Sequence, residues 1–260
     1  MEKITAKDNE KIKRYAKLAS QKKARDEQGF FVIEGIKLFE EAVRSNVEME
    51  QVFLSEGFLP RWECLQKPCP MPPAFLISEA VERKIAASPS PQGIYAVCKK
   101  LDKPLNLGKI DNNGKFIALW NLQDPGNVGT IFRAADAMGI SGIIVSENCC
   151  DLYNLKTLRS AMGSLFRMPF VIADMESFLR EHEDTLHSYA AVIDKDALSL
   201  PNADFSGGSV VVIGNEGNGL SAEQASCCRD RLTIPMPGSA ESLNAAMAAT
   251  IIIWEMAKSR

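Results

Sequence analysis

The sequence predicts an α/β protein that consists of a small N-terminal α/β domain and a C-terminal domain with a mostly parallel sheet and helices on both faces. Its 260 residues suffice for one large or two small domains with sizeable cores. After residue 115, short apolar segments alternate with helical ones, which is typical of a parallel sheet. We therefore expect one domain over 1–100, a polar linker over 101–115 and a second domain over 116–260.

The N-terminal domain is predicted from short apolar segments separated by turn signals. A proline-rich patch over 68–73 is interpreted as a surface connection, and the surrounding stretch 62–73 carries no recognisable motif. We expect strands over 30–33, 52–54 and 94–97, and helices over 35–45 and 80–87.

A run of cations precedes these elements. Although the net charge of the chain is −3, residues 11–25 contain no acid. Ile12, Tyr15, Ala16 and Ala19 give the run an apolar stripe, so we expect a helix with a basic face in solvent that could contact nucleic-acid phosphates. A charged face that is merely solvated is the alternative. The cations are Lys11, Lys13, Arg14, Lys17, Lys22, Lys23 and Arg25.

The C-terminal domain alternates strand and helix to its end. We expect strands over 116–120, 142–146, 170–173, 190–193 and 210–213, and helices over 128–138, 155–162, 175–182 and at the C-terminus. Ligands of parallel sheets gather at the carboxyl ends of the strands. Three segments at such positions are candidates for the functional site.

The first segment is 121–140. Pro125 and Gly126 make a turn, and Asn127 is the expected N-cap of the helix that follows. Arg133 falls opposite the buried stripe of this helix, where a long cation could reach across a groove. The alternative is an ordinary surface arginine paired with Asp136.

The second segment, 210–221, reads VVVIGNEGNGLS, and Glu216 is its only charge. Its glycines, at 214, 217 and 219, allow the backbone to come close to a ligand or to another strand. Their spacing matches neither the dinucleotide-binding fingerprint nor a P-loop. A plain helix-entry role for Glu216 is the alternative.

The third segment, 234–260, reads IPMPGSAESLNAAMAATIIIWEMAKSR. We expect Ser242 and Asn244 in the first turn of the terminal helix, where free N–H groups favour electron-rich ligands. The alternative, a capped helix and nothing more, accounts for Ser242 but not for Asn244. The expected buried face of the helix, at helical spacing, consists of Leu243, Met247, Ile251 and Trp254.

Composition argues against several other classes of protein. The seven cysteines contain no C-x-x-C pair and the chain has two histidines, so we expect neither a disulfide framework nor a metal site. Reduced thiols suit a cytoplasmic location. The longest apolar run, 245–254, is too short to cross a bilayer, and we expect no membrane partner.

The three segments together resemble the SpoU (TrmH-type) family of RNA ribose 2′-O-methyltransferases, within the SPOUT superfamily. Asn127 with Arg133 matches the first family motif, IGNEGNGLS the second and IPMPGSAESLN the third, and RSAMGSLF over 159–166 resembles the connecting segment. The N-terminal part is similar to the L30e-like RNA-binding domain of many members, through GFFVIEGIKLFEEA and PQGIYAV.

The resemblance implies a fold, a cofactor and partners. The family has a C-terminal trefoil knot, an exception to the rule that chains are unknotted, and binds S-adenosyl-L-methionine (AdoMet) in it. Members are homodimers packed through the knot, and their partner is RNA rather than DNA or a membrane. Residues of this chain that match the family's cofactor pocket are Gly214, Ile234, Met236 and Leu243.

The resemblance also implies catalytic roles. The matching arginine is often assigned as general base, but a guanidinium cation is so weak an acid that deprotonated arginine is rare. We therefore expect Arg133 to position the ribose and stabilise the developing alkoxide. Asn127, Ser242 and Asn244 would orient the reacting groups through hydrogen bonds, Glu216 would hold this network together, and no metal is required.

Several functions remain open. Ribosomal RNA is the expected substrate because the N-terminal domain type is frequent among its enzymes, and transfer RNA is the alternative. A catalytically inactive RNA-binding protein is argued against by the joint presence of the five candidate catalytic residues. The chain lacks the motifs of a nucleotide-dependent α/β enzyme. An enzyme of the superfamily that methylates bases or proteins is the less expected alternative, because the pairing of Arg133 with Ser-Leu-Asn is typical of the members that methylate ribose.

Overall fold

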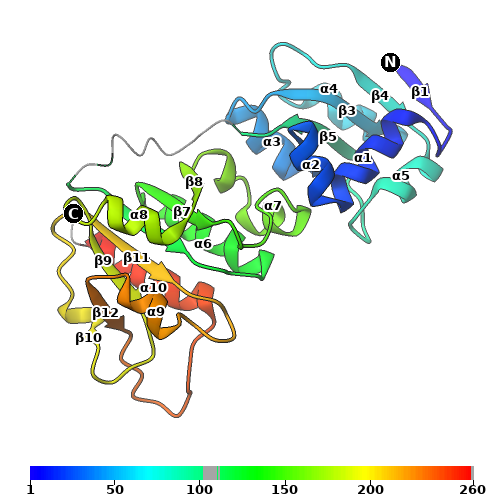
Figure 1. The fold of residues 1–260 in the computed structure, drawn as a ribbon. Helices are drawn as coiled ribbons and strands as arrows, with labels where there is room; N and C mark the ends of the chain where they lie inside the picture. The colour runs from blue at the N-terminus through cyan, green and yellow to red at the C-terminus, as the bar shows by residue number, and fades with distance from the viewer. Residues whose placement is uncertain (102–109, 111, 259–260) are drawn as a thin grey trace. The chain divides into compact units, whose positions relative to one another are not determined.

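The computed structural model describes residues 1–101, 110 and 112–258 (Figure 1). Contacts divide the chain into two compact units, one of Met1–Asp102 with Asp151–Phe166 and one of Lys103–Cys150 with Arg167–Arg260. Most of the predicted linker, 102–109 and 111, lies outside the described residues.

The first unit contains a five-stranded sheet in the order β1-β4-β3-β5-β2. The strands β1, β4 and β3 are parallel, whereas β5 is antiparallel to both β3 and β2. The strands are β1 (Glu2–Ile4), β2 (Phe30–Glu34), β3 (Met49–Ser55), β4 (Ala74–Ile77) and β5 (Ile94–Lys99), and the helices are α1 (Glu10–Ser20), α2 (Lys22–Gln28), α3 (Ile36–Arg44), α4 (Leu59–Cys64) and α5 (Glu79–Ile85).

Tyr15 of α1 lies at the centre of this unit's core. Its ring meets the rings of Phe53 and Tyr95 edge-on, with centroids 5.8 and 5.9 Å apart. Its hydroxyl donates to the carbonyl of Ile33, so the one polar atom of the side chain is satisfied. The predicted apolar stripe of α1 is therefore confirmed by burial of Ile12, Tyr15 and Leu18.

The predictions for this unit were incomplete. The sequence predicted one basic helix over 11–25, but extended backbone at Gln21 separates α1 from α2. The strands β1 and β4 and the helix α4 were not predicted. The strands are only three and four residues long, two prolines directly precede β4, and Pro60 lies in the first turn of the six-residue α4.

Residues 151–166 belong to the first unit, although the sequence assigned them to the second domain. The segment comprises α7 (Leu155–Ala161) and a 3₁₀ turn (Ser164–Phe166), and α7 contacts β2. Phe31 of β2, fully buried, lies between Tyr153 and Phe166 with ring centroids 4.9 and 6.2 Å away. The segment thus forms part of the first unit's core.

Ion pairs fix the same segment. The guanidinium of Arg25, whose side chain is 3% exposed, contacts Asp151 Oδ2 through Nε at 2.7 Å and Nη2 at 2.5 Å, and also donates to the carbonyl of Leu18. Arg159 Nη2 lies 2.8 Å from Glu34 Oε2. The buried charges of Arg25 and Glu34 are therefore paired and hydrogen-bonded, as burial of a charge requires.

The second unit contains a seven-stranded sheet in the order β10-β12-β9-β11-β6-β7-β8, and every neighbouring pair is parallel. The strands are β6 (Lys115–Leu119), β7 (Gly142–Ser146), β8 (Phe170–Ala173), β9 (His187–Ala191), β10 (Leu198–Ser199), β11 (Ser209–Ile213) and β12 (Asp230–Thr233). The helices are α6 (Pro125–Ala137), α8 (Met175–Glu181), α9 (Ala222–Ser226) and α10 (Ala245–Lys258).

The central strands β6, β7 and β11 are buried along their whole length. This explains why they read as continuous apolar runs rather than as alternating ones. Phe178 of α8 belongs to a core cluster with Phe116 and Val210, while α10 packs against α6, β6 and β11. The predicted class, α/β with a mostly parallel sheet, is confirmed.

Three predictions in the second unit were wrong. The strand expected over 190–193 occupies 187–191. The N-cap of α6 is Asp124, whose Oδ1 accepts the N–H of Asn127 at 2.9 Å, because Pro125 already takes the first helical position. Ser242 and Asn244 precede α10 rather than lying in its first turn.

The predicted buried face of α10 was also wrong. Met247, Ile251 and Trp254 are 60%, 39% and 53% exposed. The alanine-rich helix is apolar on both sides, so periodicity alone could not identify the face that packs on the sheet. The residues buried on that face are Ala246, Ala249, Ile252, Ile253 and Met256.

Within the described residues, no helix is long and apolar enough to cross a membrane.

The buried pair between Arg25 and Asp151 generates a stability prediction. We expect Asp151→Ala to lower the free energy of unfolding by about 3 kcal/mol or more, because it leaves a buried guanidinium without its carboxylate. Asp26→Ala is the matched control, since Asp26 pairs with Lys100 while its side chain is 49% exposed, and should cost less than about 1 kcal/mol. Urea unfolding of the full chain measures both values, and equal losses would contradict the structural role of Asp151.

Candidate functional site

The three candidate segments come together at the carboxyl end of the second unit's sheet. The loop 120–124 follows β6 and leads into α6, and the loop 214–221 follows β11. Because β6 and β11 are parallel neighbours, their carboxyl ends lie side by side. The third segment, 234–244, follows β12 and leads into α10, which packs against α6.

Glu216 joins the second segment to the first. Its Oε2 accepts the N–H of Gln123 at 3.0 Å, and its Oε1 accepts the N–H of Asp124 at 2.9 Å and Nδ2 of Asn127 at 3.2 Å. A carboxylate here also meets the positive end of the α6 dipole. Glu216 therefore connects the two loops. A residue that only marked the entry to a helix would not make these contacts.

These hydrogen bonds change the acidity of Glu216. Partial burial acts to raise the pKa of its carboxyl, but the hydrogen bonds from Gln123, Asp124 and Asn127 outweigh burial and leave the pKa below its ordinary value. The group is thus held as a carboxylate, which can serve as an acceptor and not as an acid.

Asn127 and Asn244 extend the connection to the third segment. Asn244 Nδ2 donates to Asn127 Oδ1 at 3.0 Å. Asn244 Oδ1 accepts the N–H groups of Ala246 at 2.9 Å and Met247 at 3.3 Å, so its side chain caps α10. A continuous chain of hydrogen bonds therefore runs from Glu216 through Asn127 and Asn244 to the start of α10.

The glycine-rich loop needs glycine for its own closure. A side chain at Gly214 would collide with the backbone of Gly219 and Leu220, and Gly219 has a φ of +66°. Asn215 and Gly219 exchange backbone hydrogen bonds of 3.1 and 2.8 Å across the loop. These contacts hold Glu216 at the tip of a tight turn.

Arg133 lies on α6 outside this hydrogen-bonded chain. Its side chain is exposed, and in the described part of the chain it has no ion-pair or hydrogen-bond partner. The alternative pairing with Asp136 is not observed, because Asp136 Oδ2 is 2.8 Å from Arg167 Nη2. Arg133 follows Asn127 by six residues, which is about 9 Å along a helix axis.

The remaining candidates lie in the third segment, apart from Gly214. Ile234, Met236 and Leu243 are half-buried, and Ser242 is exposed. The Ser242 hydroxyl has no hydrogen-bond partner among 1–101, 110 and 112–258. The structure therefore places these residues in one loop, with only Asn244 joined to the hydrogen-bonded chain.

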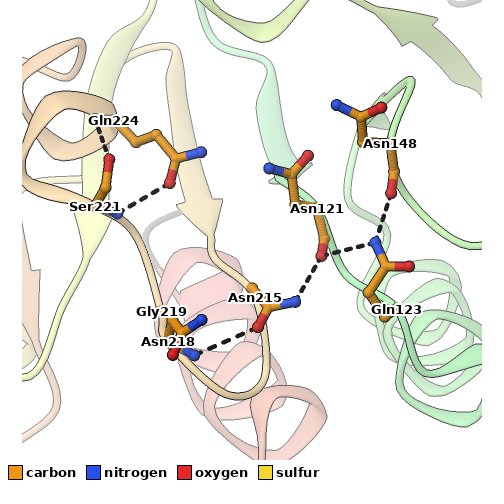
Figure 2. Close-up of a pocket in the computed structure, with 8 residues that line it drawn as sticks. All are labelled: Asn121, Gln123, Asn148, Asn215, Asn218, Gly219, Ser221 and Gln224. Atoms are coloured by element: carbon orange, nitrogen blue, oxygen red, sulfur yellow. Dashed lines mark hydrogen bonds between the residues drawn. The ribbon is translucent and has the colours of Figure 1, made fainter.

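A polar cavity of about 460 Å³ in the second unit was not predicted from the sequence (Figure 2). It is lined by Asn121, Gln123, Asn148 and Asn215 and by Asn218, Gly219, Ser221 and Gln224. The signal for it was present, because Asn121, Asn148 and Asn215 each follow the carboxyl end of a central strand. The candidate cofactor residues do not line it.

The basic N-terminal residues divide into two groups. The assignment of Arg25 to RNA binding is wrong, because the side chain is buried against Asp151. Arg14 pairs with Glu50 and Gln28, and Lys11 lies over the ring of Phe75. The exposed cations are Lys13, Lys17, Lys22 and Lys23.

The structure also bears on whether side chains of this protein could bind a metal ion. Among the described residues, no group of three or more His, Cys, Asp or Glu side chains is arranged to hold a metal ion.

Comparison with known protein families gives two matches. Residues 114–254 match the SpoU rRNA Methylase family, and residues 9–96 match the MRM3-like substrate binding domain.

Individual proteins are similar over the same regions. A 23S rRNA (guanosine(2553)-2′-O)-methyltransferase of Bacillus subtilis, RlmP, is 31% identical over 98% of this chain and 99% of its own. A 23S rRNA (uridine(2479)-2′-O)-methyltransferase of Streptomyces viridochromogenes is 37% identical over 52% of this chain and 50% of its own. An AdoMet-bound rRNA methyltransferase of Sinorhizobium meliloti has a TM-score of 0.86 at 30% identity, covering 99% of this chain and 97% of its own.

The lowered pKa of Glu216 predicts a pH-dependent stability. A carboxylate whose pKa is lower in the folded chain stabilises the fold at pH values above its unfolded pKa, and this contribution is lost as the pH falls through the folded pKa. We expect Glu216→Gln to cost about 1 kcal/mol at neutral pH, since the group is exposed, and progressively less below about pH 4.5.

Chemical unfolding of both proteins between pH 3 and pH 7 measures this difference. Glu223→Gln, at an exposed acid of α9, is the control and should change stability little at any pH. A cost of Glu216→Gln that stayed constant down to pH 3 would contradict the lowered pKa.

Proposed function

Because the chain belongs to the SpoU rRNA Methylase family, we propose that it transfers the methyl group of AdoMet to a ribose 2′-hydroxyl of ribosomal RNA. The single observation that carries this proposal is the chain of hydrogen bonds from Glu216 through Asn127 to Asn244. It joins one residue from each of the three segments that resemble the family motifs. The two similar 23S rRNA 2′-O-methyltransferases described above support the same reaction.

The residues assigned to AdoMet have the chemical character that such a ligand needs. Ile234, Met236 and Leu243, all half-buried and apolar, can form the wall against an adenosine. Gly214 is buried and has no room for a side chain, so that part of the loop can offer only backbone groups. When bound, AdoMet supplies an electrophilic methyl group, and the protein supplies binding and orientation.

Arg133 is the proposed group for the ribose and its phosphate. A guanidinium carries a positive charge and N–H donors but no acceptor, so Arg133 can stabilise the oxygen as negative charge develops. Its exposure and lack of a partner within the described residues leave its five N–H donors available. We propose that solvent water, rather than Arg133, accepts the proton of the 2′-hydroxyl.

The asparagines and Ser242 are proposed as positioning groups. Asn127 and Asn244 fix the start of α10 relative to α6, so the loop 234–244 that carries the cofactor residues is held at its end. The exposed hydroxyl of Ser242 is available to a ribose oxygen or to the cofactor's carboxylate.

Arg133→Lys tests the role of the guanidinium fork. We expect it to lower kcat for methyl transfer by about tenfold or more, because lysine keeps the charge but not the two parallel donors. AdoMet affinity, measured by calorimetry, should stay unchanged. Arg180→Lys, at an exposed arginine of α8, is the control, and an Arg133→Lys enzyme with full kcat would refute the role.

The first unit is proposed to bind the RNA. The match of residues 9–96 to a substrate binding domain supports this role, as do the exposed Lys13, Lys17, Lys22 and Lys23. Lys13 pairs with Glu10 and Lys23 with Glu27, and both pairs are at the surface. Contacts of this kind read phosphate rather than sequence.

Because its proposed substrate is ribosomal RNA, we place the enzyme in the cytoplasm, which cell fractionation would check.

Mapping of 2′-O-methyl groups across ribosomal and transfer RNA tests the proposed reaction directly. In a strain without the gene, we expect one site in ribosomal RNA to lose its methyl group and to regain it when the gene is restored. Loss of a site in transfer RNA would instead support the alternative substrate. An unchanged map, together with no AdoMet binding by the purified chain, would leave only an inactive RNA-binding protein.

We also propose a homodimer and a knot. Met247, Ile251 and Trp254 form an exposed apolar stripe on α10, which a second copy of the chain could cover. A monomer in light scattering at micromolar concentration would contradict the dimer.

The proposed trefoil knot, expected of the family, would have residues 234–258 passing through the preceding chain, and a crystal structure without that crossing would contradict it.

A further inference from the structure

The polar cavity at the ends of β6, β7 and β11 has no part in the roles assigned above (Figure 2). Arg133 and the proposed AdoMet residues do not line it. It nevertheless lies next to the site, because Gln123 lines the cavity and also donates its backbone N–H to Glu216.

The cavity walls are held in place by hydrogen bonds within the loops. Asn121 accepts the hydroxyl of Ser146 at 3.2 Å through Oδ1, and its carbonyl accepts Nδ2 of Asn215 at 2.9 Å. Gln123 Nε2 donates to the carbonyl of Asn148 at 2.6 Å. Ser221 and Gln224 form a reciprocal capping box at the start of α9. Preformed walls of this kind reduce the entropy that a ligand must overcome.

Other polar atoms of the same residues remain available. In the described residues no partner is found for Nδ2 of Asn121, Oε1 of Gln123, Nε2 of Gln224 or the side-chain amides of Asn148 and Asn218. The cavity therefore offers both donors and acceptors that are not used by the protein.

The chemistry of these groups selects the ligand. None of the lining residues is charged, so the cavity lacks the cations that would bind a phosphate and the carboxylates that would bind a metal ion. Side-chain amides pair well with flat, neutral groups that carry a donor beside an acceptor, as asparagine and glutamine do with nucleobase edges. The volume is in the range of small-ligand sites.

We propose that this cavity binds one unpaired nucleobase of the RNA substrate. The base is unpaired because pairing would occupy the edge that the amides read, and because a concave site needs a base that has left the stack. The inference rests on the proposed function, since it names how that site holds its substrate. The bound base contacts the loops that also hold Glu216 and Asn127, which places a substrate nucleotide beside the hydrogen-bonded chain.

The test uses the double variant Asn148→Ala with Asn218→Ala in the full chain. Both side chains are exposed and their amides are unpaired within the described residues, so we expect an unchanged melting temperature. The carbonyl of Asn148 that accepts from Gln123 is retained. Asn202→Ala, at an exposed asparagine outside the cavity, is the matched control.

Methyl transfer to ribosomal RNA from a strain without the gene, and AdoMet binding by calorimetry, are measured for each protein. We expect the double variant to raise KM for RNA about tenfold or more, as for loss of bidentate contacts to a base, with AdoMet affinity unchanged. An unchanged KM would overturn the proposal, and so would a loss of AdoMet affinity, because it would assign the cavity to the cofactor. Failure of the unmodified protein to bind AdoMet or to methylate RNA would instead overturn the proposed function first.

Nucleoside titrations keep the inference testable without the natural RNA. Adenosine, guanosine, cytidine and uridine are added separately to the isotope-labelled full chain, and amide resonances are followed. We expect at least one nucleoside to shift Gly219 and the side-chain amides of Asn148 and Asn218 saturably, and the double variant to lose the Gly219 shift. Shifts confined to 234–243, or none at all, would contradict the proposal.

Discussion

The carboxylate of Glu216 can only accept hydrogen bonds, and this property sets the direction of each hydrogen bond that follows it in the site. Asn127 must turn its Nδ2 toward the carboxylate, so its Oδ1 faces Asn244 and requires a donor there. Asn244 then has its Oδ1 free for the N–H groups at the start of α10. One negative charge thereby orients two side-chain amides and the start of α10. The proposed cofactor loop, 234–244, leads into α10, and Arg133 lies on α6, the helix that carries Asn127.

The parallel sheet makes this arrangement possible. The strands β6 and β11 are neighbours with carboxyl ends at the same edge, so the loops after them meet without long connections. The glycines at 214 and 219 let the second loop fold back on itself, which presents Glu216 to the backbone of the first. The same two loops, together with Asn148 after β7 and Gln224 of α9, line the polar cavity. Substrate and cofactor would therefore be held by neighbouring sides of one loop system.

Much of this fold and site was predictable from local sequence patterns. Buried strands such as 116–119 and 210–213 are continuous apolar runs, and Asn127, Arg133, Glu216 and Asn244 stand in motifs with fixed spacing. The wrong predictions involve partners that are distant in sequence or choices between similar faces. Arg25 looked like a surface cation because its partner, Asp151, lies 126 residues away, and α10 is apolar on both sides. The cavity was missed because nothing in the sequence shows that Asn121, Asn148 and Asn215, which follow three different strands, line one hollow.

A double-mutant cycle between Glu216 and Asn244 tests most directly whether the chain through Asn127 acts as one unit. The rate constant kcat is measured for the unmodified protein, Glu216→Gln, Asn244→Ala and the double variant, on the same ribosomal RNA. The account predicts strong non-additivity, with the double variant losing little more activity than the worse single variant, because either change breaks the same chain. Losses that multiply, as they do for independent residues, would contradict it.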